Sequence, residues 1–305
     1  MGQTIGVLIA IVSSGLGGSA AAVTRYLANG VDAITLAILR WAIGLALVLP
    51  VTLILRAKWP SRSDLPRVLA LGACFFGLFF VLYNVAIGYT TAARASLALS
   101  TLPLQTMVIG ALLGIESLSL RKSLGVAIAM FGVFASLALG LSTAPSGAWR
   151  GEAIMVAAVL CMAFYNVWSR PFIQRSSALG FLCVGMASGA TMLIVVGVLT
   201  GRVSVLVDLS AAQWVAGIYL GLGGGAVAFI LWVTALQRTT PTLVANTMTV
   251  NPIVAGLLAT QLIGEPFTIN LVGGVVTVFA GIWIATTAPS KRTVSKPDDD
   301  ASMAM

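Results

Sequence analysis

Ten apolar runs, separated by short polar segments, dominate the pattern of this 305-residue chain. Each run is about 20 residues long, the length that an α-helix needs to cross the hydrocarbon core of a bilayer. Charged and turn-forming residues fill the breaks, for example at 56–62, 145–147 and 264–266. The pattern predicts an all-α polytopic membrane protein with ten transmembrane helices. These spans cover approximately residues 4–24, 33–55, 67–88, 94–114, 122–141, 152–170, 178–199, 212–235, 242–262 and 269–287.

The composition excludes an ordinary soluble domain. Only 9% of the residues are charged and the mean hydropathy is +1.03, whereas soluble domains carry roughly 25% charged residues. No Lys or Arg precedes the first apolar run, so we expect an uncleaved span and not a signal peptide. The chain has no His, and its three Cys lie in apolar spans without metal-ligand spacing. We therefore expect no cofactor and no metal site.

The second half of the chain repeats the first. Residues 71–132 match residues 220–281 without a gap and with 13 identities. A single proline in span four (Pro103) falls on one in span nine (Pro252), in the register set by the other identities. The repeat predicts two five-helix units, residues 1–145 and 146–288.

Five spans per unit is an odd number, so the second unit enters the membrane from the opposite side. Spans one and six correspond at an offset of 145, where Arg25 falls on Arg170. In inverted-repeat carriers, the substrate site lies near the midplane between the two units, and access alternates as one unit rocks against the other. We therefore predict two inverted repeats around a central cavity. Residues 289–305 are predicted to be a disordered cytoplasmic tail.

The basic residues predict the orientation. With both termini in the cytoplasm, twelve of the 17 Lys and Arg residues lie inside or at inner span ends. Four (Arg25, Arg94, Arg150 and Arg202) lie outside, and Arg40 lies within span two. The net charge of +8 is thus an orientation signal and not a sign of nucleic-acid binding. We expect a multi-pass protein of a bacterial-type inner (plasma) membrane.

Several motifs resemble those of one family. Spans four and nine each contain a proline and end at a glutamate (Pro103 with Glu116, Pro252 with Glu265). Together with the segment 86–96 and the Leu-Arg-Trp sequence at 39–41, this pattern resembles the EamA-type exporters of the drug/metabolite transporter superfamily. The resemblance covers nearly the whole chain. It implies a basket of helices around a cavity lined by spans one to four and six to nine. It also implies export of amino acids, metabolites or cationic drugs. Within the family, the aromatic residues named below look most like the branch that exports aromatic and other neutral amino acids.

Pro103 and Pro252 are the candidate hinges. Each proline removes a backbone donor and frees a carbonyl about four residues earlier, at Leu99 and Met248. The alternative is a static kink, since membrane helices tolerate proline. Asn251 precedes the second proline and can bond the freed groups, whereas Leu102 cannot.

Polar and aromatic residues within spans are the candidate substrate contacts. Polar groups are costly at membrane depth, so each requires a role, either in a cavity or in hydrogen bonds between helices. An aromatic pocket suits an apolar side chain with a polar tip, although lipid-facing aromatics are the simpler reading for any one residue. The polar candidates are Ser100, Gln105, Asn166, Asn246 and Asn251. The aromatic candidates are Phe79, Tyr83, Tyr165, Trp168 and Trp232.

Charged residues leave two alternatives open. Arg40 lies about 10 Å deep in span two, and it either extends to the outer surface or faces the interior as a carboxylate clamp or gate. Glu116 and Glu265, at span ends, are expected to be solvated loop acids or helix-packing anchors. No Asp or Glu lies in the middle of any span, so we expect no intramembrane carboxylate for proton coupling.

The sequence thus predicts a secondary transporter and not an enzyme. It would export amino acids or similar small metabolites across the inner membrane by alternating access, as an uncoupled uniporter or with weak coupling. The alternatives are a proton-coupled exporter of cationic drugs or other metabolites, a membrane-embedded enzyme and a channel. The expected partners are a small-molecule substrate and the lipid bilayer, with no nucleic acid, and the chain is expected to act as a monomer.

Overall fold

The computed structural model describes residues 2–114, 120–140, 144–266 and 268–286, and every element within them is helical. Eight helical segments in this part of the chain are long and apolar enough to cross a membrane, and two shorter apolar helices accompany them. The predicted all-α polytopic fold is confirmed. The elements are α1 (Gly2–Leu27), α2 (Ala33–Ile54), α3 (Leu65–Gly72), η1 (Ala73–Phe79), α4 (Phe80–Tyr89), α5 (Ala92–Leu99), α6 (Leu102–Leu112), α7 (Leu120–Leu139), α8 (Ala148–Arg175), α9 (Ala178–Leu199), η3 (Arg202–Asp208), α10 (Ala211–Tyr219), η4 (Leu220–Val227), α11 (Ala228–Arg238), α12 (Pro241–Asn246), η5 (Thr247–Thr249), α13 (Val250–Ile263) and α14 (Ile269–Thr286).

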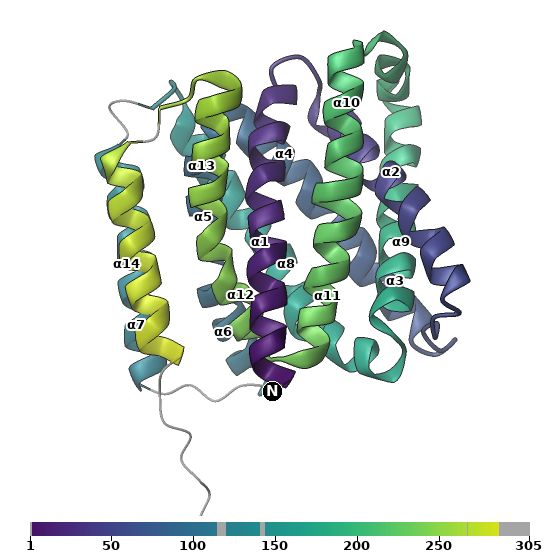
Figure 1. Cartoon of the computed structure of the whole chain (residues 1–305), viewed down its shortest axis with the longest axis horizontal. Coiled ribbons are helices and arrows are strands. Elements are labelled where there is room, and N and C mark those ends of the chain that lie inside the picture. The colour runs from purple at the N-terminus through teal and green to yellow at the C-terminus, as the bar shows by residue number, and fades with distance from the viewer. Residues whose placement is uncertain (1, 115–119, 141–143, 267, 287–305) are drawn as a thin grey trace, which may run out of the picture.

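The helices stand side by side in one bundle. Figure 1 shows α1 at the front, with α12 and α13 on one side of it and α10 and α11 on the other. The helices α7 and α14 pack against each other at one edge, while α2 and α9 pack together toward the opposite edge. Figure 1 therefore places elements of the first and second halves side by side across the whole bundle.

Within the described residues, four spans are interrupted, and the interruptions fall at matching places in the two halves. Span three (α3, η1, α4) and span eight (α10, η4, α11) each contain a π-helical segment. Span four changes from α5 to α6 at Ser100 and Thr101, and span nine passes through the 3₁₀ turn η5. Pro103 and Pro252 lie at the second and third positions of the helices that follow. The predicted backbone breaks are present, whereas the π-helical segments were not expected.

Glycines mark a reciprocal contact between α7 and α14. A Cβ atom at Gly132 would lie 3.4 Å from the carbonyl oxygen of Gly274, and one at Gly281 would collide with the backbone at Gly125. With the 149-residue offset, Gly132 corresponds to Gly281 and Gly125 to Gly274. The two contacts are therefore the same contact made twice, as at an interface with approximate two-fold symmetry.

The same reciprocity holds deeper in the bundle. A Cβ atom at Gly44 in α2 would lie 3.6 Å from the backbone nitrogen of Ala226, and one at Gly189 in α9 would lie 3.0 Å from that of Gly77. Gly44 corresponds to Gly189 at the offset of 145, and Gly77 to Ala226 at the offset of 149. A Cβ atom at Gly44 would also lie 3.2 Å from the carbonyl oxygen of Gly221, and one at Gly189 would collide with Phe76, so both crossings are tight at the glycine.

Two ion pairs join the halves at one end of the bundle. Arg25 Nε lies 2.7 Å from Glu265 Oε1, and Glu265 also accepts a hydrogen bond from the backbone of Ala92. Arg94 Nε lies 2.6 Å from Glu152 Oε1. Of the two roles expected for Glu265, the structure supports the packing anchor. Glu116 lies outside the described residues, as does the predicted tail.

A third ion pair lies at the opposite end of α8. Arg175, the last residue of α8, donates two hydrogen bonds of 2.9 and 3.0 Å to Asp64, which precedes α3. This hydrogen bonding lowers the pKa of the Asp64 carboxyl below its usual value. The pair links span three of the first half to span six of the second.

Candidate functional site

A cluster of aromatic rings fills the interior where spans two, three, six and eight meet. Phe75 stacks on Tyr165 with 4.4 Å between ring centroids, and Trp41 meets Phe80 edge to face at 4.5 Å. Such pairs add stability beyond the area that they bury. Each ring in the cluster is at most 9% exposed. The interior aromatic cluster consists of Trp41, Phe75, Phe76, Phe79, Phe80, Tyr83, Tyr165 and Phe229.

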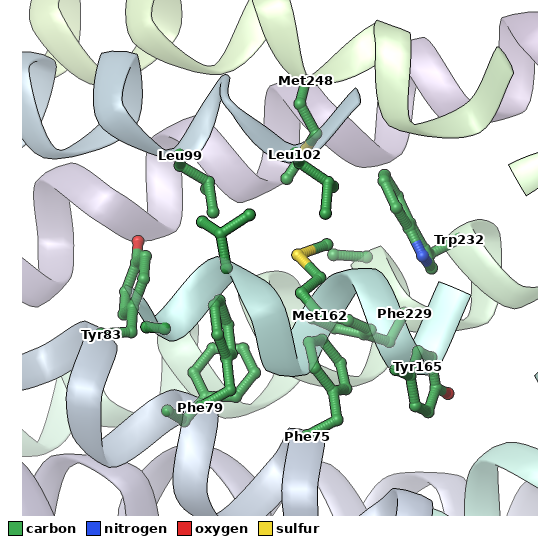
Figure 2. Packing of buried hydrophobic residues seen from close by; sticks show 14 of the residues in the cluster. Phe75, Phe79, Tyr83, Leu99, Leu102, Met162, Tyr165, Phe229, Trp232 and Met248 are labelled. Carbon is green, nitrogen blue, oxygen red and sulfur yellow. The ribbon is translucent and has the colours of Figure 1, made fainter. Parts of the chain in front are cut away.

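Equivalent positions of the two halves place an amphipathic ring in the interior. Tyr83 falls on Trp232 at the offset of 149, and both are nearly fully buried. In Figure 2, Leu99 and Leu102 of span four and Met248 of span nine point toward the region between these two rings. Both halves therefore contribute a ring with a polar tip to one apolar interior.

The interior also holds polar atoms without partners. Trp232 Nε1 donates a 3.1 Å hydrogen bond to Asn166 Oδ1, but Asn166 Nδ2 has no partner. The hydroxyl of the neighbouring Tyr165 has none either. Buried polar groups are normally hydrogen-bonded, so these unused donors are suited to a ligand.

Arg40 faces the interior and does not extend to the surface. Its side chain is buried, with the residue only 3% exposed. Nη2 donates a 2.7 Å hydrogen bond to the carbonyl oxygen of Gly224 in η4, and the guanidinium carbon lies 4.7 Å from the centre of the Phe80 ring. Of the two positions that the sequence left open, the structure selects the interior one.

The break in span nine packs against α1. The hydroxyls of Ser14 and Thr247 lie 2.8 Å apart, and Thr247 also donates to the carbonyl oxygen of Ala10. Asn246 Nδ2 and Asn251 Oδ1, on either side of this contact in the sequence, are buried without partners. In span four, Ser100 instead bonds the carbonyl of its own helix at Ser96. Span four has unpartnered buried atoms of its own, on Ser96, Gln105 and Thr106, so both broken spans carry unused polarity.

A family model described as "EamA-like transporter family" matches the chain twice, over residues 4–138 and 149–287. The two matches cover most of the chain. The chain belongs to the EamA-like transporter family. Each match corresponds to one half of the sequence repeat.

Named relatives of this EamA-like protein are transporters. The "Probable terminal-alkyne amino-acid exporter" of Streptantibioticus cattleyicolor is 26% identical over 247 residues, covering 80% of this chain and 81% of that protein. The "Uncharacterized inner membrane transporter YedA" of Escherichia coli is 28% identical over 250 residues, covering 76% and 77%. These names indicate a multi-pass bacterial membrane transporter and not an enzyme.

A solved crystal structure shares the EamA-like fold. It superimposes with a TM-score of 0.70 at 19% sequence identity, covering 93% of this chain and 97% of that one. At this identity the likeness concerns the fold alone.

Two sequence candidates lie apart from the interior of this EamA-like protein. Trp168 is 43% exposed, stacks on Phe164 and lines an apolar surface pocket of about 690 Å³. Gln105 donates to the carbonyl oxygen of Val156 and lines a different surface pocket, of about 750 Å³, with Glu152. Helical spacing places Trp168 on the same broad face as Tyr165, but Trp168 lies at the edge of that face, beside Phe164, and its ring is exposed.

Other interior residues were missed as contacts. Phe75 lies four residues before Phe79, so helical spacing could have identified it. Trp41 follows Arg40, and its ring contacts those of Phe76 and Phe80 in the cluster. Sequence reasoning had no signal for Tyr219, whose hydroxyl lies 2.5 Å from that of Ser19 across 200 residues of chain.

Proposed function

We propose that this protein exports amino acids or closely similar small metabolites across the inner membrane by alternating access, with both termini in the cytoplasm. The observation that carries the proposal is the buried interior shared by the two halves. It combines apolar rings with polar atoms, on Tyr165, Asn166 and Asn246, that have no protein partner. An amino acid offers an apolar side chain for the rings and charged groups for the polar atoms. The amino-acid exporter named among the relatives supports the same substrate class.

The broken spans suit the rocking motion. The α5 and α12 helices end inside the bundle, at Leu99 and Asn246. Helix ends within a transporter direct backbone carbonyls at cationic groups, here the ammonium group of the substrate. Pro103 and Pro252 hold these ends in place in our proposal, and they serve as the hinges.

Transport is proposed to be downhill. Among the described residues, Asp and Glu occur only near span ends or between spans, as with Asp32, Asp64, Glu152, Asp208 and Glu265. A proton-coupled carrier normally places such a group at membrane depth.

Counterflow in proteoliposomes tests the proposal. Vesicles preloaded with a neutral amino acid, such as L-leucine or L-phenylalanine, should accumulate the labelled form, and unlabelled amino acids should compete. A pH gradient alone should not drive accumulation, so strong gradient-driven uptake would contradict the uniport mechanism. Absence of saturable counterflow for every amino acid tried would reject the substrate class.

Point variants test the site. Tyr83→Ala and Asn246→Ala should reduce counterflow, because both residues are buried in the proposed path. Trp168→Ala is the matched control, since it removes a large aromatic ring from the lipid-facing surface and should leave counterflow near the wild-type rate. Wild-type kinetics in both interior variants would remove these residues from the site.

A further inference from the structure

Arg40 is a buried cation with unused hydrogen-bonding capacity. Its Nη2 atom bonds the carbonyl oxygen of Gly224, whereas Nε and Nη1 have no partner. Within the described ranges, no Asp or Glu forms an ion pair with it. A charge inside a membrane is expensive unless it is paired. The protein's own residues therefore offset only part of the cost of burying Arg40.

The scaffold does not require an arginine at this position. At the offset of 145, Arg40 corresponds to Gly185, and at the offset of 149, Gly72 corresponds to Gly221. A Cβ atom at Gly72 would collide with the backbone of Gly185, while one at Gly221 would lie 3.3 Å from the carbonyl oxygen of Arg40. The same helix crossing is thus built once with glycine and once with arginine. Packing accounts for the backbone at residue 40 but not for its side chain.

The guanidinium group retains a complete fork. Nη2 carries two hydrogens, one directed toward the Nε edge and one toward the Nη1 edge. The carbonyl of Gly224 takes one of them, so the other edge still offers two parallel N–H groups. Two parallel N–H groups match the two oxygens of a carboxylate.

The surroundings suit an organic acid. The Phe80 and Trp41 rings lie 4.7 and 5.5 Å from the guanidinium carbon. The phenol of Tyr83 lies within hydrogen-bonding reach of the guanidinium, and that of Tyr219 lies within electrostatic range of it. The site therefore joins a cation to phenol hydroxyls and to the interior aromatic cluster, which would receive an apolar side chain.

We propose that Arg40 binds the carboxylate of the transported substrate. This inference rests on the proposed function and narrows it to compounds that carry a carboxylate, with or without an amino group. Nε and Nη1 are buried in the described conformation, so the carboxylate reaches the fork when the halves move apart.

Three compounds with one carbon skeleton test the proposal. L-Leucine carries both charged groups, 4-methylpentanoate lacks the amine, and 3-methylbutylamine lacks the carboxylate. With purified full-length protein, L-leucine and 4-methylpentanoate should raise the thermal midpoint in a saturable way, whereas 3-methylbutylamine should not. The same ranking should hold for competition in the counterflow assay.

Variants at Arg40 assign the effect to this side chain. Arg40→Met should raise the apparent Kd for both carboxylates by about tenfold or more, the loss expected for one charge-assisted hydrogen bond. Arg40→Lys keeps the charge but loses the fork, so it should bind more weakly than wild type and more tightly than Arg40→Met. Arg94→Met removes a buried arginine outside the site, and it should preserve the ranking of the three compounds.

Several results would overturn the assignment. They are equal binding of 3-methylbutylamine and L-leucine, unchanged affinity in Arg40→Met, no response to any carboxylate, or a shift with chloride alone as large as that with 4-methylpentanoate. Failure of the proposed function looks different. In that case carboxylates bind in an Arg40-dependent way but no amino acid shows counterflow.

Discussion

Two arginines, Arg94 and Arg40, are equally buried but differ in their partners. Arg94 is 5% exposed and Arg40 is 3% exposed. Arg94 bonds Glu152 at 2.6 Å and the carbonyl oxygen of Leu137 at 2.7 Å. Arg40 bonds one carbonyl and leaves two nitrogen atoms unused. Burial alone therefore does not distinguish an arginine that holds helices together from one available to a ligand, whereas the partners do.

The positions of the two arginines agree with this division. Arg94 lies in the first turn of α5 and joins it to α8 and α7 near one end of the bundle. Arg40 lies about two turns into α2, beside η4 and the interior aromatic cluster. Each of the following predictions tests whether partnered polar groups carry stability while unpartnered ones do not.

The largest effect is expected at Arg94. Arg94→Met leaves the Glu152 carboxylate buried without its cation, and breaking one side of a buried pair costs about 3–5 kcal/mol. Thermal unfolding of the purified protein in detergent should show a clear fall in the midpoint. The double variant Arg94→Met/Glu152→Gln should recover part of the loss. If the single variant unfolds like wild type, the ion pair does not hold these helices.

A smaller loss is expected at Trp232. Trp232→Phe keeps most of the ring but removes the donor that bonds Asn166, and hydrogen bonds between membrane helices contribute about 1 kcal/mol. The midpoint should fall modestly. Asn246→Leu provides the contrast, because Nδ2 of Asn246 has no partner to lose. A larger fall in the thermal midpoint for Asn246→Leu than for Trp232→Phe would contradict the expectation that partnered polar groups carry the stability.

At the opposite end of the bundle, the pair of Asp64 and Arg175 should add a small, pH-dependent contribution. The hydrogen bonds from Arg175 lower the pKa of Asp64 in the folded protein below the value of about 3.9 expected in the unfolded chain. The contribution is therefore fully present above about pH 3.9 and is lost as the pH falls through the lower folded-state pKa. The midpoint difference between wild type and Arg175→Ala should be constant at neutral pH and shrink on acidification. A difference that grows in acid would contradict this sign.

The smallest effect on stability is expected at Arg40. Arg40→Met loses one hydrogen bond and a cation–π contact, but it also removes an uncompensated buried charge. The free energy of unfolding should stay within about 1 kcal/mol of the wild-type value or rise, and the thermal midpoint should change accordingly. A loss as large as that of Arg94→Met would show that Arg40 is structural, whatever its effect on transport.

The sequence predicted those features of the fold that depend on local chemistry and on the repeat. Spans of apolar residues predict helices because backbone groups in lipid must bond within their own segment. Pro103 and Pro252 mark the breaks because proline has no N–H to donate. The family assignment, made from the spacing of these prolines and their companions, is confirmed by the match to both halves.

The side-chain environment could not be read in the same way. Periodicity does not reveal which face of an all-apolar helix meets protein and which meets lipid, so Trp168 was grouped with Tyr165. Neither does it reveal the π-helical segments in spans three and eight, each of which lies against helices of the other half. The partners of Arg40 and Arg94 come from spans distant in the sequence, and only the assembled bundle separates them.

The approximate two-fold symmetry marked by the reciprocal glycine contacts between α7 and α14 has a consequence for how the sequence of such a protein can change. In a pair of identical five-helix chains, every substitution would appear twice, once on each side of the symmetry axis. An arginine at position 40 would then also replace Gly185 at the crossing of α9 with span three, where even a Cβ atom would lie 3.1 Å from the Phe76 ring. Joining the two copies in one polypeptide allows an arginine side chain at one helix crossing while the equivalent crossing in the other half keeps its glycine and its close packing. Covalent linkage thus permits an asymmetric interior within a nearly symmetric frame.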